Sequence, residues 1–149
     1  MSDDTRADRH MGEVTRRVPP RHCDAQAMMH ASRPAEYFED AFLAWLDAAC
    51  GGYGRLRMAG VDLVIAESSV RYLGSVRLGD EVTACAVAIA RGRTSLRIKF
   101  ELIRNGDILV RATTTYVCVA ESGPVDVPSV LAPALSAVPS HSPPSTGRQ

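Results

Sequence analysis

Residues 21–46, RHCDAQAMMHASRPAEYFEDAFLAWL, hold the longest predicted helix of the chain and an acid-bearing loop just before it. We expect the helix over about residues 32–50, with Ser32 as its N-cap and Pro34 in its first turn. A Gly-Gly pair should end it. Its apolar side chains recur every three or four residues, which places them on one face: Phe38, Ala41, Phe42, Trp45, Leu46 and Ala49. This face should lie in the core.

The other regular segments are predicted strands. Apolar and polar side chains alternate over residues 94–102, and the dipeptide Asn105-Gly106 then indicates a hairpin. Further candidate strands are residues 13–18, 61–73, 81–90 and 108–119. One long helix among antiparallel strands can bury its apolar face only if the sheet wraps around it. The sequence therefore predicts an α+β fold, with a curled antiparallel sheet of five or six strands around one central helix.

Length and composition limit the class of protein. A chain of 149 residues with 46% hydrophobic content suits one globular domain. The formal net charge is zero, so we expect no nucleic-acid partner. No apolar run approaches the roughly 20 residues that span a bilayer, and the first eleven residues lack a signal-peptide core. We expect no membrane association and a cytoplasmic location, with the four cysteines as free thiols.

Composition also divides the chain. Residues 1–11 are polar and charged, and we expect them to be disordered. Residues 12–121 form the predicted folded domain. Residues 122–149 are rich in Pro and Ser, so we expect a mostly disordered tail, with a short helical turn near residues 129–135.

A loop acid, a hydrophobic loop and a helix opening with an aromatic-aromatic-acid triplet follow one another in this chain. This order resembles the 4-hydroxybenzoyl-CoA thioesterase group of hotdog-fold proteins. The usual loop of that group is close to D-x-D-x-x-G-H-V-N-N-x-x-Y. Aligned without gaps, its second Asp falls on Asp24 and the triplet on Tyr37, Phe38 and Glu39. The resemblance implies a hotdog fold and a homodimer or homotetramer built by joining sheet edges.

The loop departs from the pattern of that group around the retained acid. Its first Asp, its Gly, its His and its two Asn are replaced by His22, Ala27, Met28, His30 and Ala31. The resemblance implies Asp24 as nucleophile or general base, with the backbone N–H of Ala31 holding the carbonyl oxygen. Orphan N–H groups at a helix start favour a developing oxyanion on physical grounds as well. His30, beside that N–H, could donate a hydrogen bond to the substrate.

Other residues are candidates for substrate binding or support. Met28 and Met29 should make the acyl pocket apolar and adaptable. Glu39 matches the helix acid of the family, and we favour a structural role for it over a catalytic one. A basic hairpin suits a phosphate of CoA or of a carrier's phosphopantetheine, or is a solvated turn: Arg91, Arg93, Thr94 and Ser95. His22 and His30, together with Cys23 and Asp24, could suggest metal ligands, but a zinc site needs about four convergent ligands and the sequence has no second cluster, so we expect no metal or cofactor.

These features favour a thioesterase that hydrolyses an acyl-CoA or acyl-carrier-protein thioester. An aromatic or polyketide acyl group from a biosynthetic pathway is the favoured substrate. One alternative is a non-catalytic acyl-thioester binding module. Another is a hotdog enzyme that catalyses dehydration or cyclisation with His30 as base. The sequence has no G-x-S-x-G elbow, P-loop or dinucleotide fingerprint, which argues against the corresponding enzyme classes.

Overall fold

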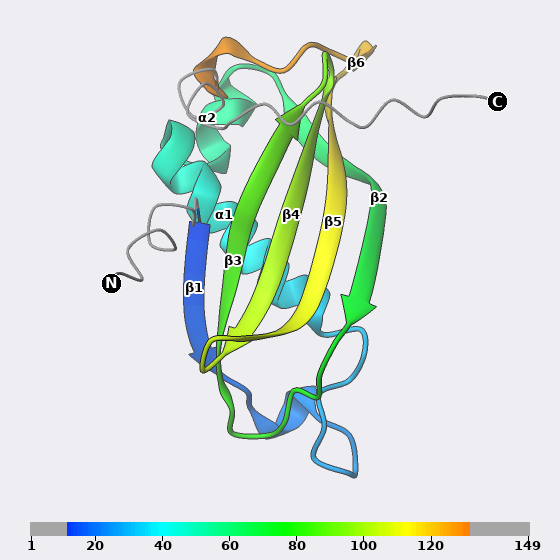
Figure 1. Cartoon of the computed structure of the whole chain (residues 1–149). Helices are drawn as coiled ribbons and strands as arrows, with labels where there is room; N and C mark the ends of the chain where they lie inside the picture. The colour runs from blue at the N-terminus through cyan, green and yellow to red at the C-terminus, as the bar shows by residue number, and fades with distance from the viewer. Residues whose placement is uncertain (1–11, 132–149) are drawn as a thin grey trace, which may run out of the picture.

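A computed structural model describes residues 12–131, in which one antiparallel sheet curls around one long helix (Figure 1). The strands are β1 (Gly12–Arg17), β2 (Asp62–Tyr72), β3 (Glu81–Arg91), β4 (Ser95–Arg104), β5 (Asp107–Ala120) and β6 (Gly123–Pro124). The helices are α1 (Pro34–Cys50), α2 (Tyr53–Met58) and the short 3-10 turns η2 (Pro20–His22) and η3 (Ser129–Leu131). The strand order is β1-β3-β4-β5-β2, and β6 pairs with the end of β5.

Helix α1 buries the face that the spacing predicts. It lies against β1, β3 and β4, on the side of the sheet away from the viewer in Figure 1. Phe38 stacks on Phe100 with ring centroids 5.3 Å apart, and Phe42 stacks on Tyr116 at 4.1 Å. These contacts join the middle of the helix to β4 and β5, so the helix is fixed in the core.

The two ends of α1 differ in how well they were predicted. Gly51 ends the helix in a left-handed conformation, with φ of 88°, as expected. The N-terminus lies later than predicted, because Arg33 is the N-cap and Pro34 the first helical residue. The assignment of Ser32 as N-cap is therefore wrong: Ser32 belongs to the turn before the helix, and no side chain caps α1. Helix α2 was also missed in a glycine-rich connection, where Leu56 is fully buried.

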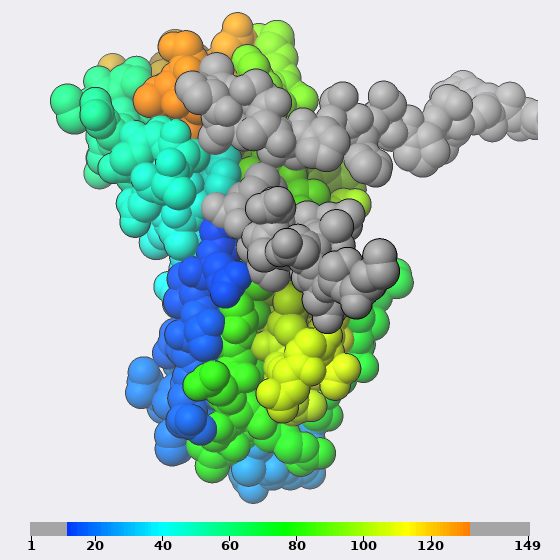
Figure 2. Space-filling view, turned by 60° about the vertical axis from the view of Figure 1, so that its left-hand side comes forward, coloured from blue at the N-terminus to red at the C-terminus, as the bar shows by residue number. Residues whose placement is uncertain are grey.

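The described core continues past residue 121, where the composition changes. Strand β6 pairs with β5, and Val127 and Leu131 are buried in the main core. The segment containing η3, orange in Figure 2, lies beside the helices, and η3 contacts α1. Residues 1–11, for which we predict disorder, and residues 132–149 of the predicted tail lie outside the described residues.

Strand β1 runs so close to α1 that a side chain would not fit at Gly12. A Cβ built there would lie 2.7 Å from the backbone nitrogen of Trp45 and 2.8 Å from its Cβ. Both distances are shorter than real Cβ contacts allow. Glycine is therefore required for this edge strand to pack on the helix.

Two matched glycine substitutions test this contact. Gly12→Ala should lower the free energy of unfolding by about 1–3 kcal/mol, because the new methyl group forces β1 and α1 apart. Gly54→Ala lies in α2 with no atom within 4 Å of the added Cβ, so it should change stability by less than about 1 kcal/mol, in the stabilising direction. Denaturant unfolding of the two variants measures the difference. Equal effects would contradict the close packing of β1 on α1.

Candidate active site

The loop between η2 and α1 folds as a small hairpin. Cys23 pairs with Met29, and the Asp24 backbone N–H donates to the carbonyl of Met28 at 2.8 Å. Asp24 Oδ1 accepts hydrogen bonds from the backbone N–H groups of Gln26, at 2.8 Å, and Met28, at 3.2 Å. Oδ2 accepts none from residues 12–131, and the side chain is exposed. The turn therefore holds one carboxylate oxygen of Asp24 and leaves the other available.

The backbone conformation of Ala27 explains why the 4-hydroxybenzoyl-CoA thioesterase group has glycine at this position. Its φ is 59°, in the left-handed region that costs an L-residue with a Cβ roughly 1–2 kcal/mol. The Ala27 N–H donates to the carbonyl of Asp24 at 3.0 Å, and its own carbonyl accepts from the N–H of Leu78 at 2.9 Å. The turn conformation is thus compatible with alanine, and tertiary contacts hold it in place.

The loop forms one wall of a cavity of about 420 Å³, which we call the loop cavity. Its lining residues come from the loop, the start of α1, the end of β2, the following connection and β5; they are Met28, Met29, His30, Ala31, Pro34, Tyr72, Leu73, Gly74, Ser75, Val76 and Val110. Four residues chosen from the sequence therefore line one cavity. Asp24 does not line it and lies beside it on the same hairpin.

Ala31 lines the loop cavity in the turn before α1. No acceptor among residues 12–131 lies within hydrogen-bond distance of its N–H. Its carbonyl accepts from the hydroxyl of Tyr72, which ties the loop to the end of β2. The residue stands three positions before Pro34, the first residue of α1. His30 lines the same cavity with an exposed side chain, and its backbone N–H donates to the carbonyl of His22 at 2.9 Å.

The far wall of the cavity was not predicted from the sequence. The connection between β2 and β3 reaches the loop through the N–H of Met29, which donates to the carbonyl of Val76 at 2.8 Å. Arg104 holds this connection by an ion pair with Asp80 at 2.6 Å and a hydrogen bond to the carbonyl of Ser75 at 3.1 Å. The antiparallel pairing of β2 with β5 places the end of β2 and Val110 at this cavity, and the bridge between Met28 and Arg77 joins the connection to the loop.

Glu39 lies apart from the loop cavity in a single subunit. Crowding by neighbouring protein atoms raises the pKa of its carboxyl above the ordinary value, and repulsion from Asp40 adds to the effect. Burial raises the pKa of Tyr116, and the charge of Glu39 raises it further. Glu39 is exposed on α1, close enough to Tyr116 of β5 for its charge to act on that hydroxyl.

The basic hairpin between β3 and β4 stands at the opposite end of the sheet from the loop (Figure 1). Strand β3 has eleven residues, so roughly 30 Å of chain separates the two ends. Arg93 forms an ion pair with Asp126 at 2.8 Å. Within one subunit, the structure does not bring Arg91, Arg93, Thr94 and Ser95 together with Asp24.

His22 lies beneath the loop as a buried polar contact to α1. Its side chain is 4% exposed, and Nδ1 lies 2.7 Å from the hydroxyl of Tyr37. Arg16 stacks over the Tyr37 ring at 4.6 Å and reaches Asp40 at 3.4 Å. Burial lowers the pKa of His22, and the positive charges of Arg16, Arg33 and Arg21 lower it further. A neutral imidazole therefore connects the loop to the helix.

Residues 12–131 contain no group of three or more His, Cys, Asp or Glu side chains arranged to hold a metal ion. None of the helices in this part of the chain has the length and apolar character to cross a membrane.

A family model described as the thioesterase superfamily matches residues 26–111. The chain belongs to this family. The match begins just after Asp24 and includes the rest of the loop, α1 and most of the sheet. A comparison with curated proteins finds no match.

Solved structures of thioesterases have the same fold. A 1,4-dihydroxy-2-naphthoyl-CoA thioesterase from Synechocystis is 18% identical, with a TM-score of 0.75, over 84% of this chain and 95% of that one. A thioesterase from Thermus thermophilus, solved with coenzyme A and zinc, is 22% identical, with a TM-score of 0.74, over 85% and 98%. A gentisyl-coenzyme A thioesterase is 15% identical, with a TM-score of 0.72, over 80% and 98%. The predicted hotdog fold is thereby confirmed.

The pH dependence of stability tests the buried state of His22. As pH falls below about 6.5, the unfolded chain binds a proton at His22 before the folded chain does. The stability that the neutral imidazole contributes is therefore complete above about pH 6.5 and is lost as pH falls toward its lowered pKa. Between pH 7.5 and 5.5, the wild-type unfolding free energy should fall more steeply than that of His22→Gln, by up to about 1.4 kcal/mol per pH unit.

His30→Gln is the matched control for this measurement, because His30 is exposed on the same loop. It should keep the wild-type slope. If His22→Gln also kept it, His22 would be charged in the folded state or accessible to solvent.

Proposed function

We propose that this protein is a thioesterase that hydrolyses an acyl-CoA thioester, with Asp24 as nucleophile or general base. Membership of the thioesterase superfamily supports the reaction type. The observation that carries the proposal is the Ala31 N–H, which has no acceptor among residues 12–131 and belongs to a residue lining the loop cavity. A carbonyl oxygen bound there gains a hydrogen bond.

Asp24 supplies the base in the simplest mechanism. Its Oδ1 is held by two backbone N–H groups, and Oδ2 takes a proton from water. The resulting hydroxide attacks the thioester carbonyl carbon, and negative charge develops on the oxygen held by the Ala31 N–H. Collapse of this intermediate breaks the C–S bond and releases the CoA thiolate. In the nucleophilic alternative, Asp24 attacks the carbonyl carbon itself and the CoA thiolate leaves as the C–S bond breaks. Water then hydrolyses the mixed anhydride, which releases the carboxylic acid and restores Asp24.

The loop cavity suits an apolar acyl group, and we favour an aromatic one. Met28, Met29 and Val76 contribute flexible or apolar walls, and the Tyr72 ring lies at the cavity edge. Two structurally similar proteins are thioesterases of 1,4-dihydroxy-2-naphthoyl-CoA and gentisyl-CoA, both thioesters of aromatic acids. A panel of aromatic and aliphatic acyl-CoAs and acyl carrier proteins, assayed by thiol release, distinguishes CoA from carrier-protein substrates.

We further propose that the enzyme is a homodimer joined through β2. This strand is an edge of the sheet with eleven residues, and its side chains are almost all exposed in one subunit. Large apolar side chains are exposed along it and just after it, namely Val64, Ile65, Val70, Tyr72 and Leu73. The opposite edge, β1, is shorter and carries Arg16 and Arg17. A long apolar edge strand needs a cover, and a second copy of β2 supplies one.

Twofold pairing would also give the basic hairpin a role. Two β2 strands that pair antiparallel about a twofold axis place the loop end of one subunit beside the hairpin end of the other. Arg91 of the partner subunit and the partner's Arg93 would then lie at the same end of the joined sheet as Asp24. This supports a CoA phosphate contact made across the dimer.

Asp24→Asn tests the catalytic assignment. Asparagine keeps an oxygen that can accept from the N–H groups of Gln26 and Met28, so the turn should persist while the charge is lost. We expect kcat for acyl-CoA hydrolysis to fall by about 10² or more, with KM little changed. Asp47→Asn, at an exposed acid of α1, is the control and should be near wild type.

His30 provides the second candidate chemistry, because it lines the loop cavity and Asp24 does not. His30→Ala leaves the Ala31 N–H in place, so we expect a smaller loss than for Asp24→Asn. If Asp24→Asn stayed active and His30→Ala lost activity, His30 would be the base. Product analysis would then separate hydrolysis from dehydration or cyclisation. Absence of thiol release from every acyl donor would instead indicate a binding module.

Ile65→Asp tests the β2 interface. Ile65 is 58% exposed on the edge strand, and twofold symmetry would bury a new charge twice at the interface. We expect the dimer dissociation constant to rise by about 100-fold or more. Met58→Asp, at an apolar residue of α2 that is 84% exposed, is the control and should leave the dimer intact. Sedimentation velocity measures both, and a monomeric wild type would refute the interface.

A further inference from the structure

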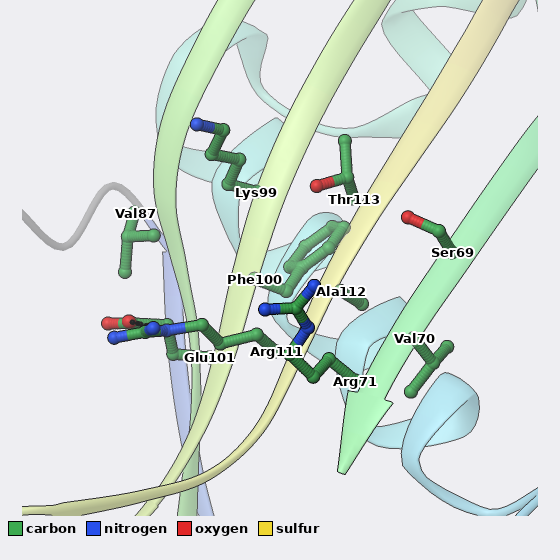
Figure 3. Close-up of a pocket in the computed structure, with 10 residues that line it drawn as sticks. All are labelled: Ser69, Val70, Arg71, Val87, Lys99, Phe100, Glu101, Arg111, Ala112 and Thr113. Carbon is green, nitrogen blue, oxygen red and sulfur yellow. Dashed lines mark hydrogen bonds and ion pairs between the residues drawn. The ribbon is translucent and has the colours of Figure 1, made fainter. Parts of the chain in front are cut away.

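The outer face of the sheet, away from α1, carries a second concavity of about 480 Å³, which we call the outer-face groove (Figure 3). Its polar lining comes from β2, β4 and β5 and comprises Ser69, Arg71, Lys99, Glu101, Arg111 and Thr113. Figure 3 shows the Arg71 side chain extending from β2 over β5. The volume of the groove lies within the usual range for sites that hold small molecules.

Strand register fixes this arrangement of charges. Arg71 lies directly opposite Arg111 across the β2–β5 pair, and Ser69 lies opposite Thr113. On the other side of β5, Thr113 lies opposite Lys99 and Arg111 opposite Glu101. Three cationic side chains and two hydroxyls therefore occupy adjacent positions on one face. Like charges directly opposite one another on a sheet are destabilising, so the Arg71–Arg111 pair has an energetic cost in the absence of an anion.

The positive charge of the groove is only partly neutralised. Glu101 accepts from Arg111 Nε at 3.2 Å. Among residues 12–131, Arg71 and Lys99 have no acidic partner. The groove thus has an excess of two positive charges, whereas the whole chain has 17 basic and 17 acidic residues. The excess results from how the strands pair and not from a basic composition.

We propose that the outer-face groove binds a phosphate or diphosphate group of a small molecule. Arg71 and Lys99 supply the unneutralised charges, which match the near-dianionic charge of a phosphate monoester. The planar guanidinium of Arg71 can donate two parallel hydrogen bonds to phosphate oxygens. The hydroxyls of Ser69 and Thr113 add neutral donors, and Glu101 holds Arg111 in place at the border of the site.

This site is separate from the catalytic one. Successive residues of a strand point to opposite faces, so Arg71 belongs to the outer face and Tyr72 to the loop cavity. The proposal therefore does not depend on thioesterase activity. A free phosphate metabolite and the phosphorylated adenosine end of CoA offer the same chemistry, and the choice of probe separates them.

Calorimetric titration of the full-length protein with pyrophosphate and with adenosine 3′,5′-bisphosphate, in a chloride buffer of low ionic strength, tests the site. We expect a dissociation constant below about 1 mM for both probes, and weakening by about tenfold or more in Arg71→Gln and in Lys99→Gln. Arg97→Gln is the matched control, because Arg97 is exposed on β4 two residues before Lys99 and does not line the groove. It should bind as the wild type does.

The outcomes distinguish a specific phosphate site from non-specific attraction of anions to a basic surface. Tighter binding of the adenosine probe, lost in Arg71→Gln, supports the proposal and identifies a nucleotide as the ligand class. Equal binding of both probes supports it and identifies the phosphate groups alone as the determinant. Failure of both probes to bind, or equal weakening by Arg97→Gln, would overturn it.

Thermal unfolding tests the site independently, because Arg71→Gln should raise the melting temperature without phosphate but reduce the stabilisation that phosphate gives. Without phosphate, Arg71→Gln should raise the melting temperature, because it removes the repulsion of Arg111. With 10 mM pyrophosphate, the wild type should gain several degrees and the variant little. A variant that melts lower without phosphate and responds fully to pyrophosphate would contradict the site. The kcat for acyl-CoA hydrolysis by Arg71→Gln should remain near wild type, because Arg71 does not line the loop cavity, which keeps this test distinct from that of the proposed reaction.

Discussion

The burial of the aromatic face of α1 is the constraint on which the rest of the structure depends. The stacks of Phe38 on Phe100 and of Phe42 on Tyr116 fix the helix against the middle strands. Gly12 then allows β1 to cross the helix at backbone distance. With both contacts made, the N-terminus of α1 can lie only at one end of the sheet. The loop before it therefore meets the end of β2, and the cavity forms between them.

The same packing leaves the edge strand β2 uncovered. Helix α1 lies against β1, β3 and β4, whereas β2 is almost fully exposed along its length. A single domain of this size buries only part of its apolar surface, and an edge strand carrying Ile65 and Val70 remains a liability until it is paired. Assembly through β2 would thus complete the core as well as the site, which is why we regard the dimer as part of the catalytic unit.

Sequence patterns predicted the elements better than their relative positions. The spacing of Phe38, Phe42 and Trp45 sufficed for the helix, because periodicity reports burial directly. Ser32 was assigned as N-cap because its type favours that position, yet the turn places Arg33 there. The sequence does not predict helix α2, because the glycines in and before this short segment disfavour a helix. The burial of Leu56 stabilises the helix instead. Neither error affects the predicted core helix, since one concerns the end of a helix and the other a connection.

The candidate site shows more clearly that sequence patterns do not predict how distant segments meet. Met28, Met29, His30 and Ala31 could be predicted because they are contiguous in sequence with the acid. The contribution of Tyr72 and Val76 depends on strand pairing, and the hydrogen bond between His22 and Tyr37 depends on helix docking, so local patterns could not reveal them. The position of the basic hairpin could have been deduced by counting strand reversals, because consecutive antiparallel turns alternate between the two ends of a sheet.

Strand β2 contributes to three surfaces that lie close together. Its inner side chains reach the loop cavity, its outer side chains carry Ser69 and Arg71, and its edge is open. If two copies pair antiparallel along that edge, the two outer-face grooves lie on one continuous face. Arg71, next to the loop end of β2, would then lie toward the hairpin end of the partner strand, so the arginine pairs of the two subunits would be set apart along the joined strands. Pairing would therefore cover the apolar edge and leave both grooves open, so the strand that closes the sheet can still present its charged face to an anion.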